Sequence, residues 1–431
     1  MIPLRFRGSL AALPADDRRA LYERASAGDS TVNVAVAEII ADVRARGDLA
    51  LRELAARFDP VVPERLEVSR DARRRALDAI DPALRRAMQR SADNIAGVHR
   101  ASMPVPVIVN PEPGISVLRR PDPLARVGVY APGGRAAYPS SVLMGAVPAR
   151  VAGVEEVVLC SPPTASGAPA DIVLAAAELA EVDRVFALGG AGAIAAMALG
   201  TDTVPRVDRI VGPGNAYVAA AKLQLVGSVA IDSPAGPSEL VVIADATSSP
   251  DVVATEMLAQ AEHDPLACVV AICIGEYVAA AVESALASLI AQQPRASIIG
   301  CALRGQGGVL TVASSDEAVD AVNAYAPEHL LLACAGAESI ADRIRGAGTI
   351  CIGETSSVAF GDYITGANHV LPTGGLARAY SGLSVLDFVR WTTCQRVDAA
   401  AARSLSADTA AFALAEGLPG HAIAGSRWSV A

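Results

Sequence analysis

Histidine is scarce in this chain of 431 residues, so the surroundings of each histidine are informative. The five histidines are His99, His263, His329, His369 and His421. Glu328 directly precedes His329 in the segment Pro327-Glu-His. An imidazole near its ordinary pKa of about 6.5 can take the proton of an alcohol, and a neighbouring carboxylate can activate water. The pair is therefore a candidate acid–base site, with a surface turn carrying a solvated glutamate as the alternative.

A metal site could be built from nitrogen and oxygen donors in three separate segments. Gln260 and His263 are three residues apart in a predicted helix, which places both side chains on one face. The other two segments are GDYITGANHVLP, with Asp362 and His369, and EGLPGH, with Glu416 and His421. Zinc binds neutral imidazole and carboxylate oxygen, and a catalytic zinc keeps coordination positions for substrate. Gln-x-x-His alone is a weak signal because glutamine is a poor zinc ligand, so a structural role for that pair stays open.

The remaining reactive residue types are expected to be structural. His99 closes an amphipathic helix, NIAGVHR, with no neighbouring ligand type, which indicates a helix-end or core histidine. The seven cysteines are odd in number and include no Cys-x-x-Cys pair, a pattern typical of reduced thiols in a cytosolic enzyme. Cys160 and Cys268 lie within apolar strand runs, which argues against a cysteine-dependent aldehyde dehydrogenase.

Three glycine-rich turns could hold a nucleotide. The segment GAGAIA at 190–195 follows a predicted strand and opens a helix, as a dinucleotide fingerprint does. Its expected acidic partner is unconvincing, because Asp208 precedes IVGPGN instead of ending the next strand. The turns YAPGG at 130–134 and GPGN at 212–215 also fall at strand ends, where open α/β sheets bind ligands.

The elements that would position these residues follow from the hydrophobic period. Residues from about 15 to 105 carry apolar positions at three- and four-residue spacing, notably over 31–46 and 71–92, and are predicted to be helical. From Ala125 short β-rich runs alternate with apolar helices, and a second such set begins at Val241. This alternation predicts parallel sheets with helices on both faces.

The bulk composition limits the classes of protein that the chain can be. Single cores stop growing near about 250–300 residues, so we expect at least two large lobes. No run reaches the roughly 18–20 uncharged apolar residues that span a bilayer, and the start MIPLRFR lacks a secretory apolar stretch, so we expect a cytoplasmic protein without a membrane partner. A net charge of −10 argues against nucleic acid as a partner.

Eight segments together resemble one known family. They are VGVYAPGGRAAYPSSVLM, ALGGAGAIAA, VGPGNAYV, AIDSPAGPSE, LAQAEHDP, YAPEHL, GDYITGANHVLPT and EGLPGH. Their order and spacing are similar to those of the histidinol dehydrogenase family, from roughly residue 30 to the end. The resemblance implies a homodimer with shared active sites. It also implies an α/β fold of two Rossmann-like, aldehyde dehydrogenase-like parallel-sheet domains with small helical N- and C-terminal extensions.

The resemblance also implies a division of the chain. Residues 1–25 would form an N-terminal extension, and residues 26–127 with 240–380 a discontinuous domain that carries the metal and catalytic residues. Residues 128–239 would form the NAD-binding domain. Residues 381–431 would form a helical extension that reaches the other subunit.

The resemblance implies roles for individual residues. The implied zinc ligands are Gln260, His263, Asp362 and, from the partner subunit, His421. Glu328 and His329 resemble the acid–base pair. The implied substrate contacts are Ser238, Glu416, His329 and the four zinc ligands. Tyr130 and Asn215 resemble NAD contacts, and His369 would lie near the site without an assigned role.

The implied activity is the oxidation of L-histidinol to L-histidine through bound L-histidinaldehyde, with one zinc per subunit and two hydride transfers to NAD, as the last steps of histidine biosynthesis. Two features depart from the family pattern. Gly192 stands where the family usually has glutamine, and the wording before Asp362, GETSSVAFGDY, resembles paralogues that oxidise sulfonated propanediols. A dehydrogenase of such an alcohol is therefore the alternative, with a non-catalytic metal or nucleotide binder as a second one.

Overall fold

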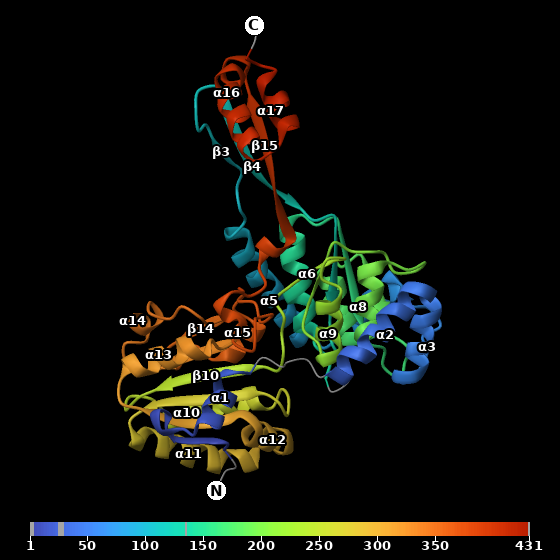
Figure 1. Cartoon of the computed structure of the whole chain (residues 1–431). Helices are drawn as coiled ribbons and strands as arrows, with labels where there is room; N and C mark the ends of the chain where they lie inside the picture. Colours follow the sequence, from blue (N-terminus) through green and yellow to red (C-terminus); the bar gives the residue numbers. More distant parts are fainter. Residues whose placement is uncertain (1–3, 25–29, 134–135, 430–431) are drawn as a thin grey trace.

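Two α/β lobes and one projecting arm make up the structure (Figure 1). The computed structural model describes residues 4–24, 30–133 and 136–429. The chain passes between the lobes more than once, so that neither lobe is a continuous stretch of sequence.

The first lobe is built on a six-stranded parallel sheet. Its strands, in spatial order, are β1 (Phe6–Ser9), β12 (Gly307–Val312), β11 (Cys268–Ile274), β10 (Glu239–Ala244), β13 (His329–Ala333) and β14 (Thr349–Ile352). The central strands are runs of valine, isoleucine and leucine because helices cover both of their faces. One face packs against α10 (Pro250–Ala261), α11 (Glu276–Leu289) and α12 (Ala296–Gln306). The other packs against α1 (Ala15–Tyr22), α13 (Ser315–Tyr325) and α14 (Ala337–Ala341).

The second lobe has a sheet of the same size in which only β2, paired with β7, runs antiparallel. Its order is β2 (Glu67–Val68), β7 (Arg184–Ala187), β6 (Glu156–Ser161), β5 (Arg126–Tyr130), β8 (Arg209–Val211) and β9 (Ala230–Ile231). One core contains α4 (Arg70–Ala79), α5 (Pro82–Ala101), α6 (Pro139–Ala152) and α7 (Asp171–Leu179). The other contains α2 (Ser30–Arg46), α3 (Asp48–Phe58), α8 (Gly190–Leu199) and α9 (Ala216–Gln224).

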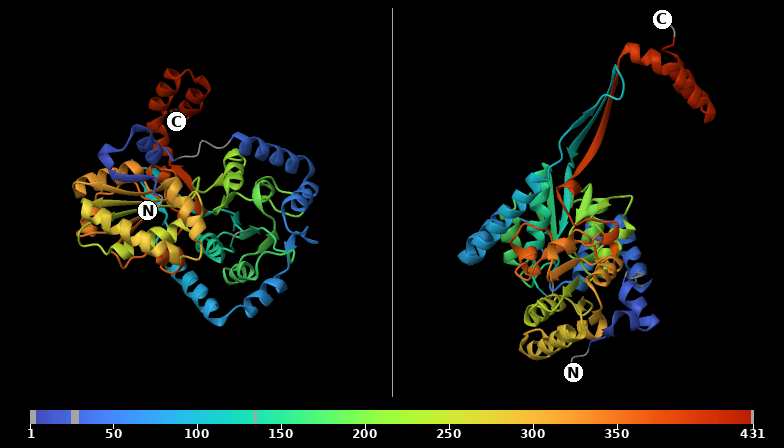
Figure 2. Two further views of the ribbon diagram at one scale, coloured as in Figure 1. Left: turned by 90° about the horizontal axis from the view of Figure 1, so that it is seen from below. Right: turned by 90° about the vertical axis from the view of Figure 1, so that its left-hand side faces the viewer.

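The arm combines a three-stranded antiparallel sheet with two helices, and it extends away from both lobes (Figures 1 and 2). The sheet has the order β15 (Val389–Val397), β4 (Ile115–Pro123) and β3 (Val107–Val109). The helices α16 (Ala399–Ala415) and α17 (Pro419–Ser426) pack on each other. Large apolar side chains stay exposed on the arm, including Phe412 at 72% and Ile423 at 74%.

The predicted α/β class with two parallel sheets is confirmed. The packing differs from the expected division of the chain into domains, in which residues 26–127 and 240–380 belong to one domain. Helices α2 to α5 cover the second sheet instead, and β1 adds an edge strand to the first. A helical period predicts that one face is buried but does not say which sheet covers it.

The C-terminal extension over 381–431 was expected to be helical. The structure differs, because residues 389–397 form the strand β15. The valine, threonine and tryptophan residues of this segment favour a strand, and β4, far away in sequence, provides the partner strand. The predicted helix over 71–92 is two helices, since Asp81 caps a new helix that begins at Pro82. None of the helices in the described parts of the chain combines the length and apolar composition that a bilayer crossing needs.

The turn after β8 depends on a glycine. Gly212 has φ +115°, and a Cβ there would lie 2.1 Å from the carbonyl oxygen of Tyr130. Gly227 also has a positive φ, +96°, but a Cβ there would meet nothing within 4 Å. Alanine substitutions at Gly212 and Gly227 therefore distinguish the cost of a positive φ alone from the added cost of steric overlap.

We expect Gly212→Ala to lower the free energy of unfolding by about 1–3 kcal/mol more than Gly227→Ala does, because only the first adds overpacking to the cost of a positive φ. Urea unfolding followed by circular dichroism measures both variants against the parent chain. Equal losses for the two variants would contradict the close approach of Gly212 to Tyr130.

Candidate active site and metal centre

His329 begins β13, an inner strand of the first sheet, and Glu328 directly precedes it; both side chains are buried. His329 is paired in register with Leu240 of β10, so the pair sits beside the start of that strand. The Oε2 atom of Glu328 accepts a hydrogen bond from the backbone N–H of Glu239 at 2.7 Å. The surface-turn alternative is therefore wrong for this pair.

The imidazole of His329 is held between three oxygen atoms. Its Nδ1 lies 3.2 Å from the carbonyl oxygen of Glu239 and 3.6 Å from Oε2 of Glu328. A carbonyl oxygen only accepts, so this contact places a proton on Nδ1 and leaves Nε2 as the basic nitrogen. Nε2 in turn lies 3.5 Å from Oδ1 of Asp362. The ring is thus oriented with Nε2 toward Asp362, which accepts a hydrogen bond from Nε2 when the ring is charged.

Charge and burial act against each other on the pKa values of this pair. Burial lowers the pKa of His329, but the Glu328 carboxylate and the hydrogen bond to Asp362 outweigh it and raise that pKa to about 10. Burial raises the pKa of Glu328, and the charge of His329 only partly offsets this effect. The two groups therefore hold protons more tightly than free side chains do.

Asp362 lies next to this pair, on a helix that contacts α10. Asp362 is buried near the end of α15 (Val358–Tyr363), whose first N–H donates to Oε2 of Glu256 in α10 at 3.1 Å. Gln260 is buried in the last turn of α10, and His263 follows the helix end. Burial raises the pKa of Asp362, but the hydrogen bond and charge of His329, with smaller effects of His369 and His263, lower it overall.

His369 connects the two lobes at this site. Its Nδ1 lies 3.0 Å from the carbonyl oxygen of Asp362, and its Nε2 lies 3.4 Å from Oγ of Ser141 in α6. The neighbouring Asn368 donates to the carbonyl oxygen of Met144 at 2.8 Å. Burial lowers the pKa of His369, which favours a neutral ring. The sequence reading assigned this histidine no role, and its geometry is that of a bridge between α15 and α6.

The arm residues are not at this site within one chain. Glu416 caps the end of α16, and His421 lies in α17; both are exposed on the arm (Figure 1). Across the described residues of a single chain, no three His, Cys, Asp or Glu side chains gather closely enough to hold a metal ion. Gln260, His263 and Asp362 supply nitrogen and oxygen donors that fit zinc, which needs at least one further ligand.

Sequence reasoning missed Glu239, the residue after Ser238. Glu239 is 2% exposed although it begins a fully buried strand, ELVVIA. Its carboxylate accepts two hydrogen bonds from Arg24, at 3.0 and 3.1 Å, and one from the N–H of Gly374 at 2.8 Å. An acidic residue at the head of an apolar strand was the available signal. Ser238 is half-buried, and its carbonyl oxygen accepts from the N–H of Cys268 at 2.9 Å.

The two residues expected to contact NAD lie at the carboxyl edge of the second sheet. Tyr130 ends β5, and its hydroxyl accepts a hydrogen bond from the N–H of Gly190 at 3.0 Å. Burial raises the pKa of Tyr130 to about 12, so the hydroxyl stays protonated. Asn215 caps α9, with its side chain accepting from the N–H groups of Tyr217 and Val218. Gly134 of the YAPGG turn lies outside the described residues.

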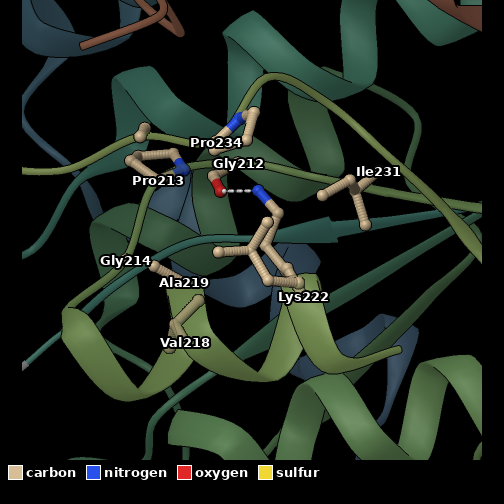
Figure 3. Close-up of a pocket in the computed structure, with 10 residues that line it drawn as sticks. Gly212, Pro213, Gly214, Val218, Ala219, Lys222, Ile231 and Pro234 are labelled. Atoms are coloured by element: carbon tan, nitrogen blue, oxygen red, sulfur yellow. Dashed lines mark hydrogen bonds between the residues drawn. The ribbon is translucent and has the colours of Figure 1, made fainter. Parts of the chain in front are cut away.

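A buried ion pair, Lys222 with Asp232, braces the turn before α9. Figure 3 shows the hydrogen bond between Lys222 and Gly212 in this turn. Lys222 donates to the carbonyl oxygen of Gly212 at 3.0 Å, and Asp232 accepts from the N–H of Gly212 at 2.7 Å. Lys222 and Asp232 also pair with each other. A small pocket beside them is lined by Gly212, Pro213, Gly214, Val218, Ala219, Lys222, Leu223, Ile231, Pro234 and Ala235.

Gly192, which departs from the family pattern, faces α3 in the second lobe. A Cβ at this position would lie 2.9 Å from Cδ1 of Leu54. A longer side chain would therefore have to displace Leu54. The glycine at this position allows α3 and α8 to pack closely.

The cysteines and His99 have the structural settings expected from the sequence. All seven cysteines fall in the described parts of the chain and are free. Burial raises the pKa of Cys160 and raises that of Cys268 to about 12, which excludes a reactive thiolate at either position. His99 is buried in the last turn of α5 and accepts from the N–H of Val385 at 3.3 Å.

Comparisons with known proteins agree on one family. The chain matches the family described as Histidinol dehydrogenase over residues 22–427. It is 46% identical to the histidinol dehydrogenase of Methanothermobacter thermautotrophicus, over 93% of this chain and 94% of that protein. The corresponding protein of Halobacterium salinarum is 47% identical, over 96% and 97% of the two chains.

A solved structure of a histidinol dehydrogenase, from Elizabethkingia anophelis, superposes with a TM-score of 0.93. The two chains are 34% identical, and the superposition covers 100% of this chain and 98% of the other. With a buried glutamate–histidine pair beside an aspartate, and with these matches over nearly its whole length, the chain belongs to the histidinol dehydrogenase family.

Proposed function

We propose that this protein oxidises L-histidinol to L-histidine through bound L-histidinaldehyde, with two successive hydride transfers to NAD⁺. The observation that carries the proposal is the buried Glu328–His329 pair beside Asp362 in a chain of this family. The enzyme works in the cytoplasm, an assignment that its seven free cysteines support.

The metal would be held by Gln260, His263 and Asp362 of one chain and by the partner subunit's His421. The support is the chemistry of the donors, an amide oxygen, two imidazoles and one carboxylate, which leaves a bound zinc ion with net positive charge. Bound zinc would act as a Lewis acid for the substrate's imidazole and amine, and bound NAD⁺ would accept hydride. Tyr130 and Asn215 stand at the sheet edge where NAD⁺ would bind.

The acid–base work falls to the buried pair. His329 takes the hydroxyl proton of the alcohol on Nε2, because Nδ1 is engaged by the Glu239 carbonyl oxygen. The ring must be neutral for this step. Asp362, whose hydrogen bond helps to raise the pKa of His329, would bind the metal instead and would no longer hold a proton on Nε2.

His329 then releases this first proton to solvent. Glu328 takes a proton from the water that attacks the aldehyde, and the neutral His329 accepts the hydroxyl proton of the resulting diol. Ser238 and Glu416 contact the substrate. Burial of the pair keeps bulk water away from the reactive aldehyde.

The active site is shared within a homodimer. Within one chain, His421 and Glu416 are exposed on an arm that projects from the lobes (Figure 2). The arm helices border a mostly apolar groove lined by Ala410, Leu414, Pro419, Gly420, Ala422, Ile423, Ala424, Ser426 and Arg427. Exposed apolar side chains at these positions need a covering surface. A second copy provides that surface and receives His421 and Glu416 in its site.

The proposed activity makes a stoichiometric prediction. With limiting L-histidinol and excess NAD⁺, we expect two NADH for each histidinol consumed, measured by absorbance and by chromatography of the product. The segment GETSSVAFGDY around Asp362 suggested dihydroxypropanesulfonate as the alternative substrate. We expect it to turn over at least about 100-fold less efficiently, because it has no imidazole that could bind the metal. Chelation of zinc should stop the reaction, and added zinc should restore it. A preference for the sulfonate would overturn the proposal.

Substitutions in the acid–base pair should separate its two roles. His329→Asn is expected to lower turnover by about 10²–10⁴-fold with little loss of zinc, because the ring serves as a base and not as a ligand. Glu328→Gln should slow aldehyde oxidation at least as much as alcohol oxidation. Rates with histidinol and with histidinaldehyde, together with zinc content by mass spectrometry, test both statements. Parallel losses of zinc and turnover in His329→Asn would refute the assignment.

Shared sites can be tested by complementation. Asp362→Ala and His421→Ala should each be inactive alone, whereas mixed dimers of the two, isolated with two affinity tags after co-expression, should have about half of the parent activity, since one of their two sites is intact. Dimers carrying both tags on Asp362→Ala chains are the control. Inactive mixed dimers would place His421 in the same site as Asp362 of its own chain.

A further inference from the structure

A buried carboxylate at the head of β10 has no part in the steps above. Glu239 lies between β11 and β13 in the middle of the first sheet, where its neighbours along the strand are apolar. Burying an unpaired carboxylate is costly, so a charge at this position needs a partner and a reason to be there. The contacts of Glu239 show which cation pairs with its carboxylate and which groups it orients.

Glu239 contacts both members of the acid–base pair at once. Its N–H donates to Oε2 of Glu328 at 2.7 Å, and its carboxylate accepts from the N–H of Glu328 at 3.4 Å. Its carbonyl oxygen lies 3.2 Å from Nδ1 of His329. The rotation of Glu328 and the tautomer of His329 therefore depend on where the backbone and the side chain of Glu239 are held.

Arg24 holds that side chain. Its Nε and Nη2 atoms donate to the two carboxylate oxygens of Glu239, and its Nη1 and Nη2 also donate to the carbonyl oxygens of Leu21 and Tyr325, at 3.0 and 2.9 Å. The guanidinium carbon stacks 3.3 Å from the ring centroid of Tyr325. A planar guanidinium with this many fixed partners has one orientation, so it fixes the carboxylate that it grips.

We propose that Arg24 and Glu239 form a positioning pair, through which the N-terminal segment sets the orientation of Glu328 and His329. The inference rests on the proposed function, since it concerns the same acid–base pair. Neither residue touches the proposed metal ligands on α10 and α15 in the contacts above, so the pair should act on turnover without acting on the metal.

The test compares Glu239→Gln, Arg24→Met and Arg24→Lys with the parent dimer loaded with zinc. We expect Glu239→Gln and Arg24→Met to lower kcat by about tenfold or more, because small displacements of reacting groups reduce rates steeply, while KM and zinc content stay within about twofold. Arg24→Lys keeps the charge but loses the two-pronged grip, so its kcat should be intermediate. Glu239→Gln has nearly the parent shape and decides the matter if Arg24→Met fails to fold.

Arg73→Met is the matched control. Arg73 is another buried arginine, but it lies in the second lobe and donates to the carbonyl oxygens of Val182 and Asp183. The Arg73→Met substitution should lower the melting temperature while kcat stays within about twofold of the parent value. If folded Glu239→Gln and Arg24→Met also keep kcat, the positioning role is overturned. If His329→Asn and Glu328→Gln retain turnover in the same assay, the proposed function itself fails.

Discussion

The pairing of buried charges at the amino ends of β10 and β13 is the constraint on which the rest of the structure depends. Two carboxylates and the Glu239 carbonyl oxygen surround one imidazole there, and Glu328, His329, Asp362 and Glu239 are all buried. An unpaired charge in such a place costs several kcal/mol, so every group must be met by a donor. Arg24 donates to the Glu239 carboxylate, and His329 lies within reach of the Asp362 carboxylate that α15 brings from a distant part of the sequence.

The two lobes and the arm make different contributions to the site. The first lobe supplies the proposed acid–base pair and the three proposed metal donors, and the second contains the glycine turn braced by Lys222 and Asp232. His369 joins the lobes through Asp362 and Ser141. The arm adds nothing to the site of its own chain, which is why the proposal for the complete site includes a second copy. Assembly and catalysis are therefore linked in the proposed enzyme.

Single segments of the sequence pointed to the central residues of the site. The donor types and their spacing singled out Glu328 with His329, and Gln260 with His263. The structure places Glu328 and His329 next to Asp362, and His263 is close enough to lower the pKa of Asp362. Glu239 and Arg24 escaped notice because their contact spans 215 residues of sequence. No local pattern reports which cation will meet a buried carboxylate over such a separation.

The sequence by itself determined the α/β class, the positions of most helices and strands, and the family, because hydrophobic period and motif order are local properties of the chain. Only the tertiary structure decided that helices α2 to α5 cover the second sheet, that residues 389–397 pair with β4, and that Arg24 grips Glu239. The physical reason is common to all three. Each depends on burial or pairing between segments far apart in sequence, and amphipathic patterns specify a buried face without naming its partner.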